Sequence, residues 1–427
     1  MVAKEGIGTK ILDTLLSYET IKIVTIKNKK VGFLHRLVQL AILGYVIGYA
    51  IIWKKGYQEF DQSLSAVTTK LKGVALANFS TFESPLLNGM HIFDSADYVI
   101  PPQENNEFFV MTNMIITPNQ TRGRCPEDPR FEDVYCQRDS DCREGEAVAN
   151  GNGVKTGKCV QSDQNITAYV CQIYGWCPVE LDVLPMPGHG FKKGDPLLQS
   201  AVNFTVLIKN QVTFPKFGFA RRNIISQNNT TYLKSCNYHH ESDPFCPIFK
   251  LGTIVSDAGY DFNDIAYKGG IVAIQIKWEC NLDVSEDKCR PQYSFKRIDD
   301  PHAPIASGFN FRFAQYYVEN NKQHRILYKA YGIKFEVLVN GRAGKFSPVP
   351  LFLNLGSGLA LLSIATIWCD IIVLYCLKDR QVYRSHKYHK VVDGDEPTDT
   401  DDDGDLNKGA NVSEFAYQKV EDENDPD

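Results

Sequence analysis

The chain has 427 residues, which excludes a single small module and is enough for at least one large core. Its net charge of −5 is unevenly placed. Residues 391–427 carry 14 Asp and Glu against two Lys, which leaves about +7 for the rest of the chain. The acidic end has no apolar periodicity, so we expect 378–427 to form a disordered tail.

Two apolar runs are candidate transmembrane helices. Residues 1–32 are polar and basic, and we expect no cleavable signal peptide in them. The runs follow at 33–53 and 349–377, and each is long enough to cross a bilayer, since roughly 20 helical residues span the hydrocarbon core. The alternative is a buried helix of a soluble protein, but the two runs bracket a region of very different composition.

That region, 54–348, has the composition of an extracellular domain. Ten of the twelve cysteines lie between Cys125 and Cys289, which predicts a disulfide framework. Zinc is the alternative, but regularly repeated Cys-x-x-Cys pairs are missing. Basic residues lie before the first run and after the second, so we expect both chain ends in the cytoplasm. Six sequons in this region are candidate glycosylation sites: Asn78, Asn119, Asn165, Asn203, Asn228 and Asn229.

The outer region is predicted to be mostly β-structure. Residues 202–210, 269–280 and 330–339 are rich in β-branched and aromatic residues, and turns such as Asn340-Gly341 are expected to punctuate the strands. The segment 119–177 is polar and holds six cysteines, which predicts a lobe stabilised by bridges instead of a core. The expected fold is a membrane protein with two transmembrane α-helices per subunit and a large β-rich, disulfide-stapled ectodomain.

The second run carries polar residues that lipid contact does not require. Leu353, Ser357, Ala360 and Ile364 recur at helical spacing, and Asn354 lies beside them. A pore face is one interpretation; helix packing through Gly356, Ser357 and Gly358 is the other. Two spans cannot enclose a conduit, so a channel requires several subunits, most simply in a ring.

Basic residues outside the membrane are candidates for binding a polyphosphate. Lys70 and Lys72 point the same way if they lie on a strand, and Asn310, Arg312 and Lys329 add further donors. A solvated face is the alternative. Glu59 and Asp61, just outside the first run, are expected to enrich cations there.

Catalytic patterns are not evident. The segment 151–159 superficially resembles a phosphate loop, but its glycines have the wrong spacing and Cys159 replaces the Ser or Thr. Neither Gly-x-Ser-x-Gly nor His-Glu-x-x-His occurs. The pair His239-His240 is more simply explained as an exposed loop than as a metal site. We therefore expect no enzyme activity and no bound metal.

Several blocks of the sequence resemble the trimeric ATP-gated ionotropic purinergic receptors. They include VTTKLKGVA (67–75), NFTVLIKN (203–210), FPKFGFARRNI (214–224), NFRFAQYY (310–317) and KAYGIKFEVLVNGRAGKF (329–346). Ten ectodomain cysteines between two spans complete the likeness. The resemblance implies a non-selective channel in the plasma membrane, opened by extracellular ATP and passing Na⁺, K⁺ and Ca²⁺.

The resemblance also implies the binding residues. ATP is expected between subunits of a homotrimer, or of a heterotrimer with related subunits, as agonist and without any other cofactor. Lys70, Lys72, Arg312 and Lys329 match phosphate contacts, with Asn310 beside them; Thr205 matches an adenine contact and Leu207 an apolar neighbour. Leu233 and Ile248 match apolar contacts from the adjoining subunit. Membrane lipid is the other expected partner, and no nucleic acid is expected.

Carried over residue by residue, the resemblance supplies the remaining features. The pore would narrow at Leu353, Ser357 and Ala360. Thr25-x-Lys27 matches a phosphorylation pattern, and Tyr383-x-x-x-Lys387 a membrane-retention signal. The implied bridges are Cys125–Cys177, Cys136–Cys159, Cys142–Cys171, Cys236–Cys246 and Cys280–Cys289.

Three other classes of protein compete with this interpretation. A proton-gated or constitutive sodium channel shares the architecture but does not need the lysine cluster. An ecto-nucleotidase binds extracellular ATP with two spans, but it needs paired Asp-x-Gly phosphate loops, which we do not find. A non-conducting adhesion protein would not need a polar seam in its second span.

Overall fold

The protein is represented by a computed structural model that describes residues 28–79, 88–101, 105–184, 192–224, 232–304, 306–378 and 380–381. The expected motifs at Thr25 and Tyr383, the sequons at Asn228 and Asn229 and nearly all of the acidic tail lie outside these residues. The chain divides into two compact units, one of Met1–Val46 with Gly356–Asp427 and the other of Ile47–Leu355.

Two helical runs carry the predicted spans. Helix α2 (Lys29–Leu43) begins at Asn28, whose side chain accepts hydrogen bonds from the first free backbone N–H groups. It continues as the helical segment η1 (Gly44–Trp53). The complete run, Lys29–Trp53, is long and apolar enough to cross a membrane.

The second run is formed by α7 (Pro348–Ile371) and η7 (Ile372–Cys376), and it passes the same length and composition test. Gly358 on α7 is buried against Val46 of η1, and a Cβ at this glycine would lie 2.7 Å from a Val46 methyl carbon. Glycine therefore permits the close approach of these two helices.

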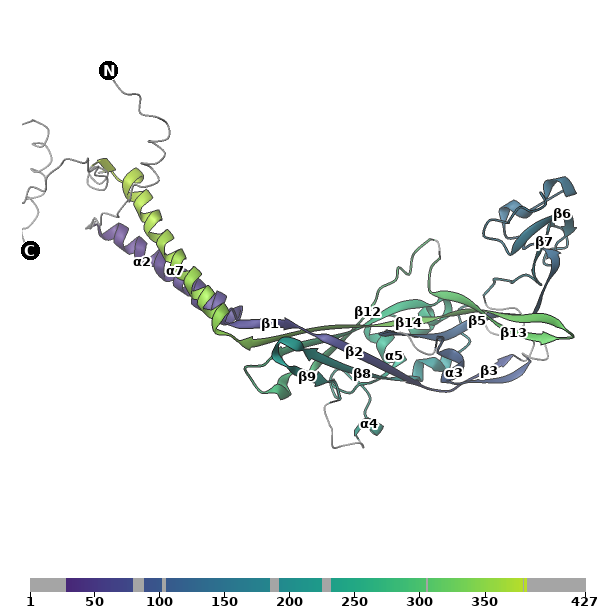
Figure 1. The fold of residues 1–427 in the computed structure, drawn as a ribbon, viewed down its shortest axis with the longest axis horizontal. Helices are drawn as coiled ribbons and strands as arrows, with labels where there is room; N and C mark the ends of the chain where they lie inside the picture. The colour runs from purple at the N-terminus through teal and green to yellow at the C-terminus, as the bar shows by residue number, and fades with distance from the viewer. Residues whose placement is uncertain are drawn as a thin grey trace, which may run out of the picture. The chain divides into compact units, whose positions relative to one another are not determined.

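The unit Ile47–Leu355 is β-rich and is organised by two long antiparallel strands (Figure 1). Strand β14 (Lys322–Phe346) has 25 residues and β5 (Glu107–Pro126) has 20. They belong to an eight-stranded sheet with the order β12-β11-β14-β5-β7-β6, and β1 and β13 also pair with β14. Its other strands are β1 (Gln58–Gln62), β6 (Gly153–Gln161), β7 (Tyr169–Cys177), β11 (Gly270–Asn281), β12 (Pro291–Arg297) and β13 (Asn310–Glu319).

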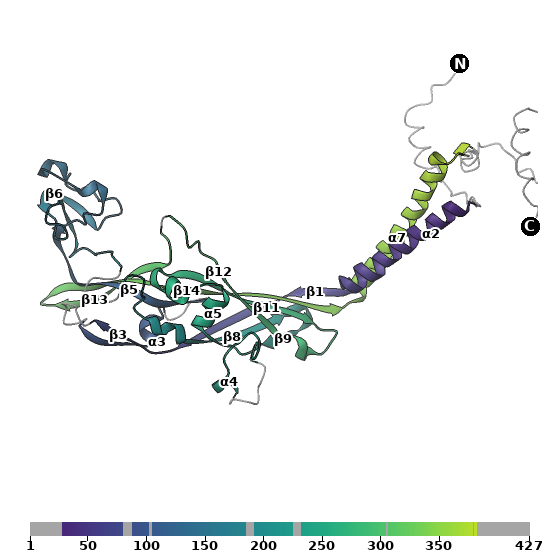
Figure 2. The same cartoon turned by 180° about the vertical axis from the view of Figure 1, so that it is seen from behind.

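A four-stranded sheet with the order β10-β8-β2, with β9 on β8, forms the second layer. Its central strand alternates half-buried and buried side chains, as expected for one solvated face. Helices α3 and α5 lie along the same side of β14 as this sheet in both views (Figure 2). The strands of this sheet are β2 (Leu64–Lys72), β8 (Thr205–Phe214), β9 (Phe219–Arg222) and β10 (Ile248–Lys250). Strands β3 (Ala75–Phe79) and β4 (Gly89–Phe93) pair with each other in a separate sheet. The short helices are α3 (Ser95–Tyr98), α4 (Tyr232–Ser235), α5 (Leu251–Asp257) and α6 (Phe262–Lys268).

A buried polar contact joins the two sheets through their shared apolar core. Trp278 on β11 is fully buried, and its indole Nε1 donates to Asn210 Oδ1 on β8 at 2.8 Å. The Asn210 amide in turn donates to the backbone oxygen of Ala66 on β2. Burying these groups without partners would be costly, so the contact fixes how the sheets are aligned.

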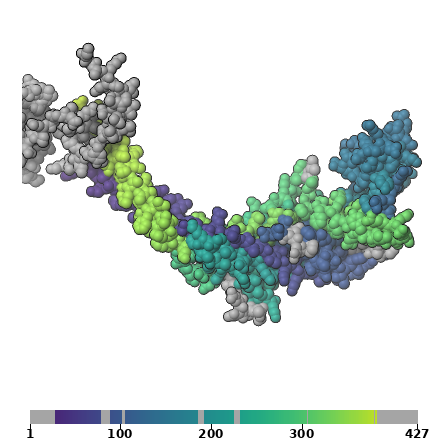
Figure 3. Space-filling view, viewed as in Figure 1, coloured from purple at the N-terminus to yellow at the C-terminus, as the bar shows by residue number. Residues whose placement is uncertain are grey.

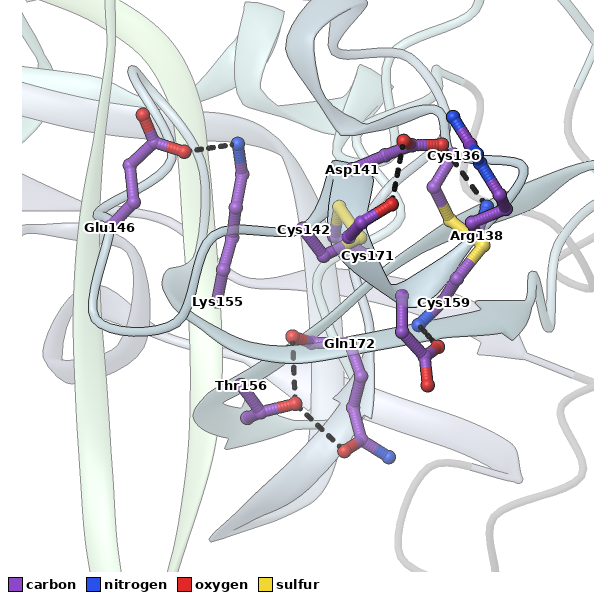
Figure 4. The surroundings of a disulfide bond; sticks show 12 residues. Cys136, Arg138, Asp141, Cys142, Glu146, Lys155, Thr156, Cys159, Cys171 and Gln172 are labelled. Atoms are coloured by element: carbon purple, nitrogen blue, oxygen red, sulfur yellow. Dashed lines mark hydrogen bonds and ion pairs between the residues drawn. A yellow bond between two sulfur atoms is a disulfide. The ribbon is translucent and has the colours of Figure 1, made fainter.

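The cysteine-rich lobe stands apart from the rest of its unit (Figure 3). Its apolar cluster is small: Cys125, Val134, Val148, Val170 and Ile173. Two bridges, Cys136–Cys159 and Cys142–Cys171, lie beside one another, and the Lys155–Glu146 ion pair is close by (Figure 4). A lobe of this size gains much of its order from such bridges.

The structure contains all five bridges that the resemblance implies, the other three being Cys125–Cys177, Cys236–Cys246 and Cys280–Cys289. The three expected strands correspond to β8, β11 and β14. One expectation was wrong: Asn340-Gly341 is no turn but lies inside β14, paired with Lys277 and Trp278. Gly341 is required there because a Cβ would lie 2.2 Å from the hydroxyl oxygen of Ser63.

Candidate functional site

The four-stranded sheet presents a basic face. Lys72 on β2 and Lys250 on β10 both lie opposite Thr205 on β8, and Lys70 and Ile248 both lie opposite Leu207. Residues directly opposite in antiparallel strands point to the same side of the sheet. We call this set the lysine face: Lys70, Lys72, Lys250, Thr205, Leu207 and Ile248.

The lysine face corrects one expectation. Ile248 pairs with Leu207 of its own chain. The two side chains therefore belong to the same face of one subunit, whereas the resemblance implied that Ile248 comes from the adjoining subunit. The sequence misleads here because β10 comes about forty residues after β8 and only the sheet register brings the two together. Leu233 lies apart on the short helix α4 and is half-buried.

A cleft of about 890 Å³ adjoins the lysine face and is lined by Lys70, Lys72, Ser95 and Asn105, among others. Both lysines are exposed, and neither has a carboxylate partner in the part of the chain that the structure describes. Two unneutralised ammonium groups on one face repel each other, which favours a bound anion.

The remaining candidate cations lie on the eight-stranded sheet. Arg312 on β13 is directly opposite Lys329 on β14, and Asn310 is opposite Tyr331. Carboxylates of the segment that follows the lobe form ion pairs with Arg312 and Lys329. Both oxygens of Asp182 lie 2.6 Å from Lys329 Nζ, and Glu180 Oε2 accepts from Arg312 Nε at 2.7 Å.

Burial and charge define the state of this acid-paired site. The Lys329 side chain is 9% exposed and that of Glu180 is 7% exposed. Burial alone would raise the pKa of Asp182, but the hydrogen bond and charge of Lys329, with help from Tyr331 and Arg312, hold that pKa below its usual value. The carboxylate is therefore ionised at neutral pH, and the pairing is lost only when the pH falls through this lowered value.

The predicted ATP contacts thus fall into two groups on different sheets. Arg312 lines a second cleft, of about 750 Å³, together with Glu180, Asp182 and Arg325. Of the lysine face, Lys70 and Lys72 line the first cleft. The structure brings together Lys70, Lys72, Thr205, Leu207 and Ile248, and separately Asn310, Arg312 and Lys329.

Three charged residues of these sites escaped the sequence analysis. Glu180 and Asp182 are two residues apart in an extended segment after the last lobe cysteine, which is the same spacing that singled out Lys70 and Lys72. The same spacing argument would have found Glu180 and Asp182. Lys250 carried no comparable signal, because only the pairing of β10 with β8 places it beside Thr205.

On α7, the residues of the polar seam differ in burial. Gly358, Ala365 and Cys369 are buried and form the packing face. Leu353, Ser357 and Ala360 are exposed on the helix. Asn354 is half-buried, and its amide donates to the backbone oxygens of Gly56 and Pro350. The seam at Leu353, Ser357 and Ala360 remains the predicted pore lining.

The expected cation-enriching carboxylates are engaged elsewhere. Glu59 Oε1 forms an ion pair with Lys216 Nζ at 2.7 Å, and Asp61 Oδ2 accepts from the Lys216 backbone N–H at 2.9 Å. Cation enrichment by Glu59 and Asp61 stays a prediction. No local pattern predicts these contacts, because Lys216 is more than 150 residues away.

The sequons that the structure describes are accessible. Asn78, Asn119, Asn165 and Asn203 are all exposed. At Asn119 the side-chain oxygen accepts a hydrogen bond from the Tyr317 hydroxyl at 2.7 Å. Glycosylation at these sites stays a prediction.

Comparisons with known proteins give the family. A family model described as ATP P2X receptor matches residues 16–390. The chain belongs to the P2X receptor family. P2X purinoceptor 4 of Mus musculus is 50% identical over 384 residues, covering 89% of this chain and 94% of that protein. P2X purinoceptor 5 of Homo sapiens is 46% identical over 381 residues, covering 88% and 82% respectively.

Solved P2X receptors share the fold. The receptor from the Gulf Coast tick, crystallised in the presence of ATP and Zn²⁺, has a TM-score of 0.73 and 48% identity, and the match covers 80% of this chain and 100% of that chain. The chicken P2X7 receptor with the competitive antagonist TNP-ATP has a TM-score of 0.68 and 39% identity, with 80% and 99% covered. P2X receptors are trimeric ligand-gated channels of the plasma membrane and not enzymes.

Proposed function

We propose that this chain forms a trimeric cation channel, opened by extracellular ATP, that passes Na⁺, K⁺ and Ca²⁺. The observation that carries the proposal is the division of eight candidate ATP contacts between two sheets, each with its own cleft. Because a triphosphate needs several cations around it, one nucleotide would be held by the lysine face of one subunit and Arg312 and Lys329 of the next.

The two faces would play different parts in binding. On the lysine face, Thr205 and Leu207 would contact the adenine while Lys70 and Lys72 meet the phosphates. Lys250 lies opposite Thr205 and supplies one further cation. On the other subunit, the phosphates would have to displace Asp182 and Glu180 from Lys329 and Arg312. The phosphates of ATP would therefore replace the carboxylates of Asp182 and Glu180 beside these cations. This replacement would release the segment 180–182.

That exchange would supply the driving force for opening. A ligand shifts a conformational equilibrium only by binding one state more tightly than the other. The jaw between neighbouring subunits would close on the nucleotide, and β14, which carries Lys329, would transmit the movement toward α7. The exposed seam of α7 would line the pore, with both chain ends in the cytoplasm and lipid around the helices.

The first test is whole-cell current on applying ATP to cells that express the chain. We expect a fast inward cation current, carried in part by Ca²⁺ when external Na⁺ is replaced. Lys72→Ala should shift the half-maximal ATP concentration by about tenfold or more, because one phosphate contact is worth on the order of 1.5–3 kcal/mol. Lys277→Ala, which changes an exposed lysine on β11, should leave the current unchanged.

The outcomes separate the competing classes of protein. A current at acid pH without nucleotide would favour the proton-gated channel. Phosphate release from ATP without current would favour the ecto-nucleotidase. Silence in a chain shown at the cell surface would contradict a homotrimeric channel, and co-expression with a related subunit would then test the heterotrimer.

A further inference from the structure

A cluster of hydrogen bonds lies where the ectodomain strands approach the two spans. Gln58 is the first residue of β1 and is only 4% exposed. Its Nε2 donates to Asn281 Oδ1 at 2.7 Å and to Asp283 Oδ2 at 2.6 Å. The other oxygen of Asp283, Oδ1, accepts from the Phe346 backbone N–H at 2.6 Å.

These bonds join three separate segments of the chain. Gln58 begins β1, which follows the first span by only a few residues. Phe346 ends β14, two residues before α7 begins. Asn281 ends β11, and the loop that follows it is closed by the Cys280–Cys289 bridge. The cluster thus ties a rigid, bridged loop to the strands leading to both spans.

The backbone around the cluster is fitted to the Gln58 side chain. Gly344 lies opposite Asn281, and a Cβ at Gly344 would be 2.5 Å from Gln58 Oε1. The Leu282 backbone N–H donates to the Gly344 oxygen at 2.8 Å. On the membrane side, the Ser347 backbone N–H donates to the Tyr57 oxygen at 3.1 Å. The glycine leaves room for a buried amide that reaches across β14 to the loop.

The position of the cluster suggests a mechanical role. Lys329 and Phe346 are on one continuous strand, about 55 Å apart at roughly 3.3 Å per residue. β11 runs parallel to β14 and pairs with it from Ile333 to Gly344. A pull on β14 reaches the first span through β1, beside the contacts that α7 makes with Val46 and Gly56. The five residues of β1 give few backbone bonds for this.

We propose that Gln58, Asn281 and Asp283 form a coupling node that makes β1, β14 and the bridged loop move as one body when the channel opens. Gln58 is a positioning residue in this scheme, because it acts through the strands and touches neither ATP nor the ion path. The inference rests on the proposed ATP-gated function. Its specific claim is that loss of the node lowers opening at saturating ATP and leaves ATP binding intact.

The test compares substitutions of Gln58 in the full-length channel. Gln58→Glu places a carboxylate against Asp283, and Gln58→Met removes both donors at similar volume. The measured quantity is the open probability at saturating ATP, from single-channel recording. We expect it to fall at least tenfold in Gln58→Glu and about threefold in Gln58→Met. Binding of radiolabelled ATP to surface receptors should change less than twofold. Gln62→Met, at the exposed end of the same strand, is the matched control.

Reversal of the pair provides a rescue. In Gln58→Glu with Asp283→Asn, the new amide would donate to the new carboxylate while its oxygen still accepts from Phe346. We expect this double variant to recover most of the open probability lost in Gln58→Glu. A merely structural role would not predict that a second substitution restores opening without changing ATP binding.

The outcomes are distinguishable from failure of the proposed function. If the unmodified chain gives no ATP current, the function itself fails. If it conducts and both Gln58 variants match the Gln62 control, the node is overturned. Loss of both variants from the cell surface, equal losses of binding and opening, or failure of the double variant to recover would likewise overturn it and leave Gln58 a role in folding alone.

Discussion

Asp182 holds Lys329 with two short contacts and Arg312 with a longer one of 3.7 Å. A ligand that needs the same cations competes with this carboxylate. The pair is mostly buried, so its strength is greater than that of an exposed surface pair. At the residue scale, Asp182 therefore neutralises cations that we propose for the ATP phosphates.

Weakening this internal anion should favour ATP. Asp182→Asn keeps an oxygen that accepts from Lys329 but removes the charge, so we expect the half-maximal ATP concentration to fall about tenfold. Concentration–response curves of whole-cell current measure this shift. Asp163→Asn, an exposed carboxylate in the lobe, should have no effect. A rise in the half-maximal concentration would show that Asp182 holds Lys329 ready for phosphate instead of competing with it.

Lys250 gives an independent test of the lysine face. Removing its charge in Lys250→Ala should raise the half-maximal ATP concentration about fivefold, because an exposed cation contributes roughly 1 kcal/mol to a nearby phosphate. Lys268→Ala, another exposed lysine at the end of α6, serves as the control. Equal responses of the two variants would remove Lys250 from the site.

At the scale of elements, β14 connects Lys329, a proposed ATP contact, to α7, and it pairs with β5 along much of its length. That register shifts between Tyr331 and Gly332, which is a bulge just beyond Lys329. At Gly332 a Cβ would lie 2.1 Å from the Val110 backbone oxygen on β5. The close approach of the two strands therefore requires glycine.

A methyl group at this position should disrupt the ectodomain. We expect Gly332→Ala to destabilise it by about 3 kcal/mol, since backbone atoms must move apart to accept the Cβ. Surface biotinylation and the thermal unfolding of detergent-solubilised receptor measure the loss. Gly123→Ala on β5 has open space around its Cβ and should express normally. Unaltered stability of Gly332→Ala would mean that the bulge adapts.

For the whole molecule, we propose that the buried and exposed faces of α7 have separate tasks. Gly358 and Ala365 are buried against the rest of their unit, and Ser357 is exposed. A trimer would turn the exposed seam toward a common axis. Small side chains at Ser357 and Ala360 would then leave room for hydrated cations to pass.

Thiol labelling tests this assignment. Ser357→Cys should make ATP-evoked current sensitive to a charged methanethiosulfonate reagent, with most of the current lost after labelling in the open state. Ala365→Cys, on the packing face, should resist the same reagent. The unmodified chain, which already carries Cys369 and Cys376, sets the background. Block of Ala365→Cys with Ser357→Cys unaffected would reverse the proposed orientation of α7.

The sequence alone determined the two spans, because a continuous apolar run of sufficient length is a local property. The five bridges came through the family resemblance and are confirmed, whereas the outer position of 54–348, argued from cysteines and sequons, stays a prediction. Lys70 and Lys72 were found from their spacing, and β8, β11 and β14 from their composition. The spans, the two lysines and the strands are local properties of the chain, whereas the bridges join distant segments and were supplied by the resemblance alone.

Only the tertiary structure decided what depends on pairing between distant segments. The pairing of β10 with β8 places Ile248 beside Leu207 of its own chain, and it adds Lys250 to the lysine face. Lys216 binds Glu59 through its side chain and Asp61 through its backbone N–H. Lys329 forms an ion pair with Asp182, and Arg312 forms one with Glu180. Asn340-Gly341 stayed in its strand because β11 pairs with it. Strand pairing is set by burial and side-chain fit across the sheet, which no local pattern encodes.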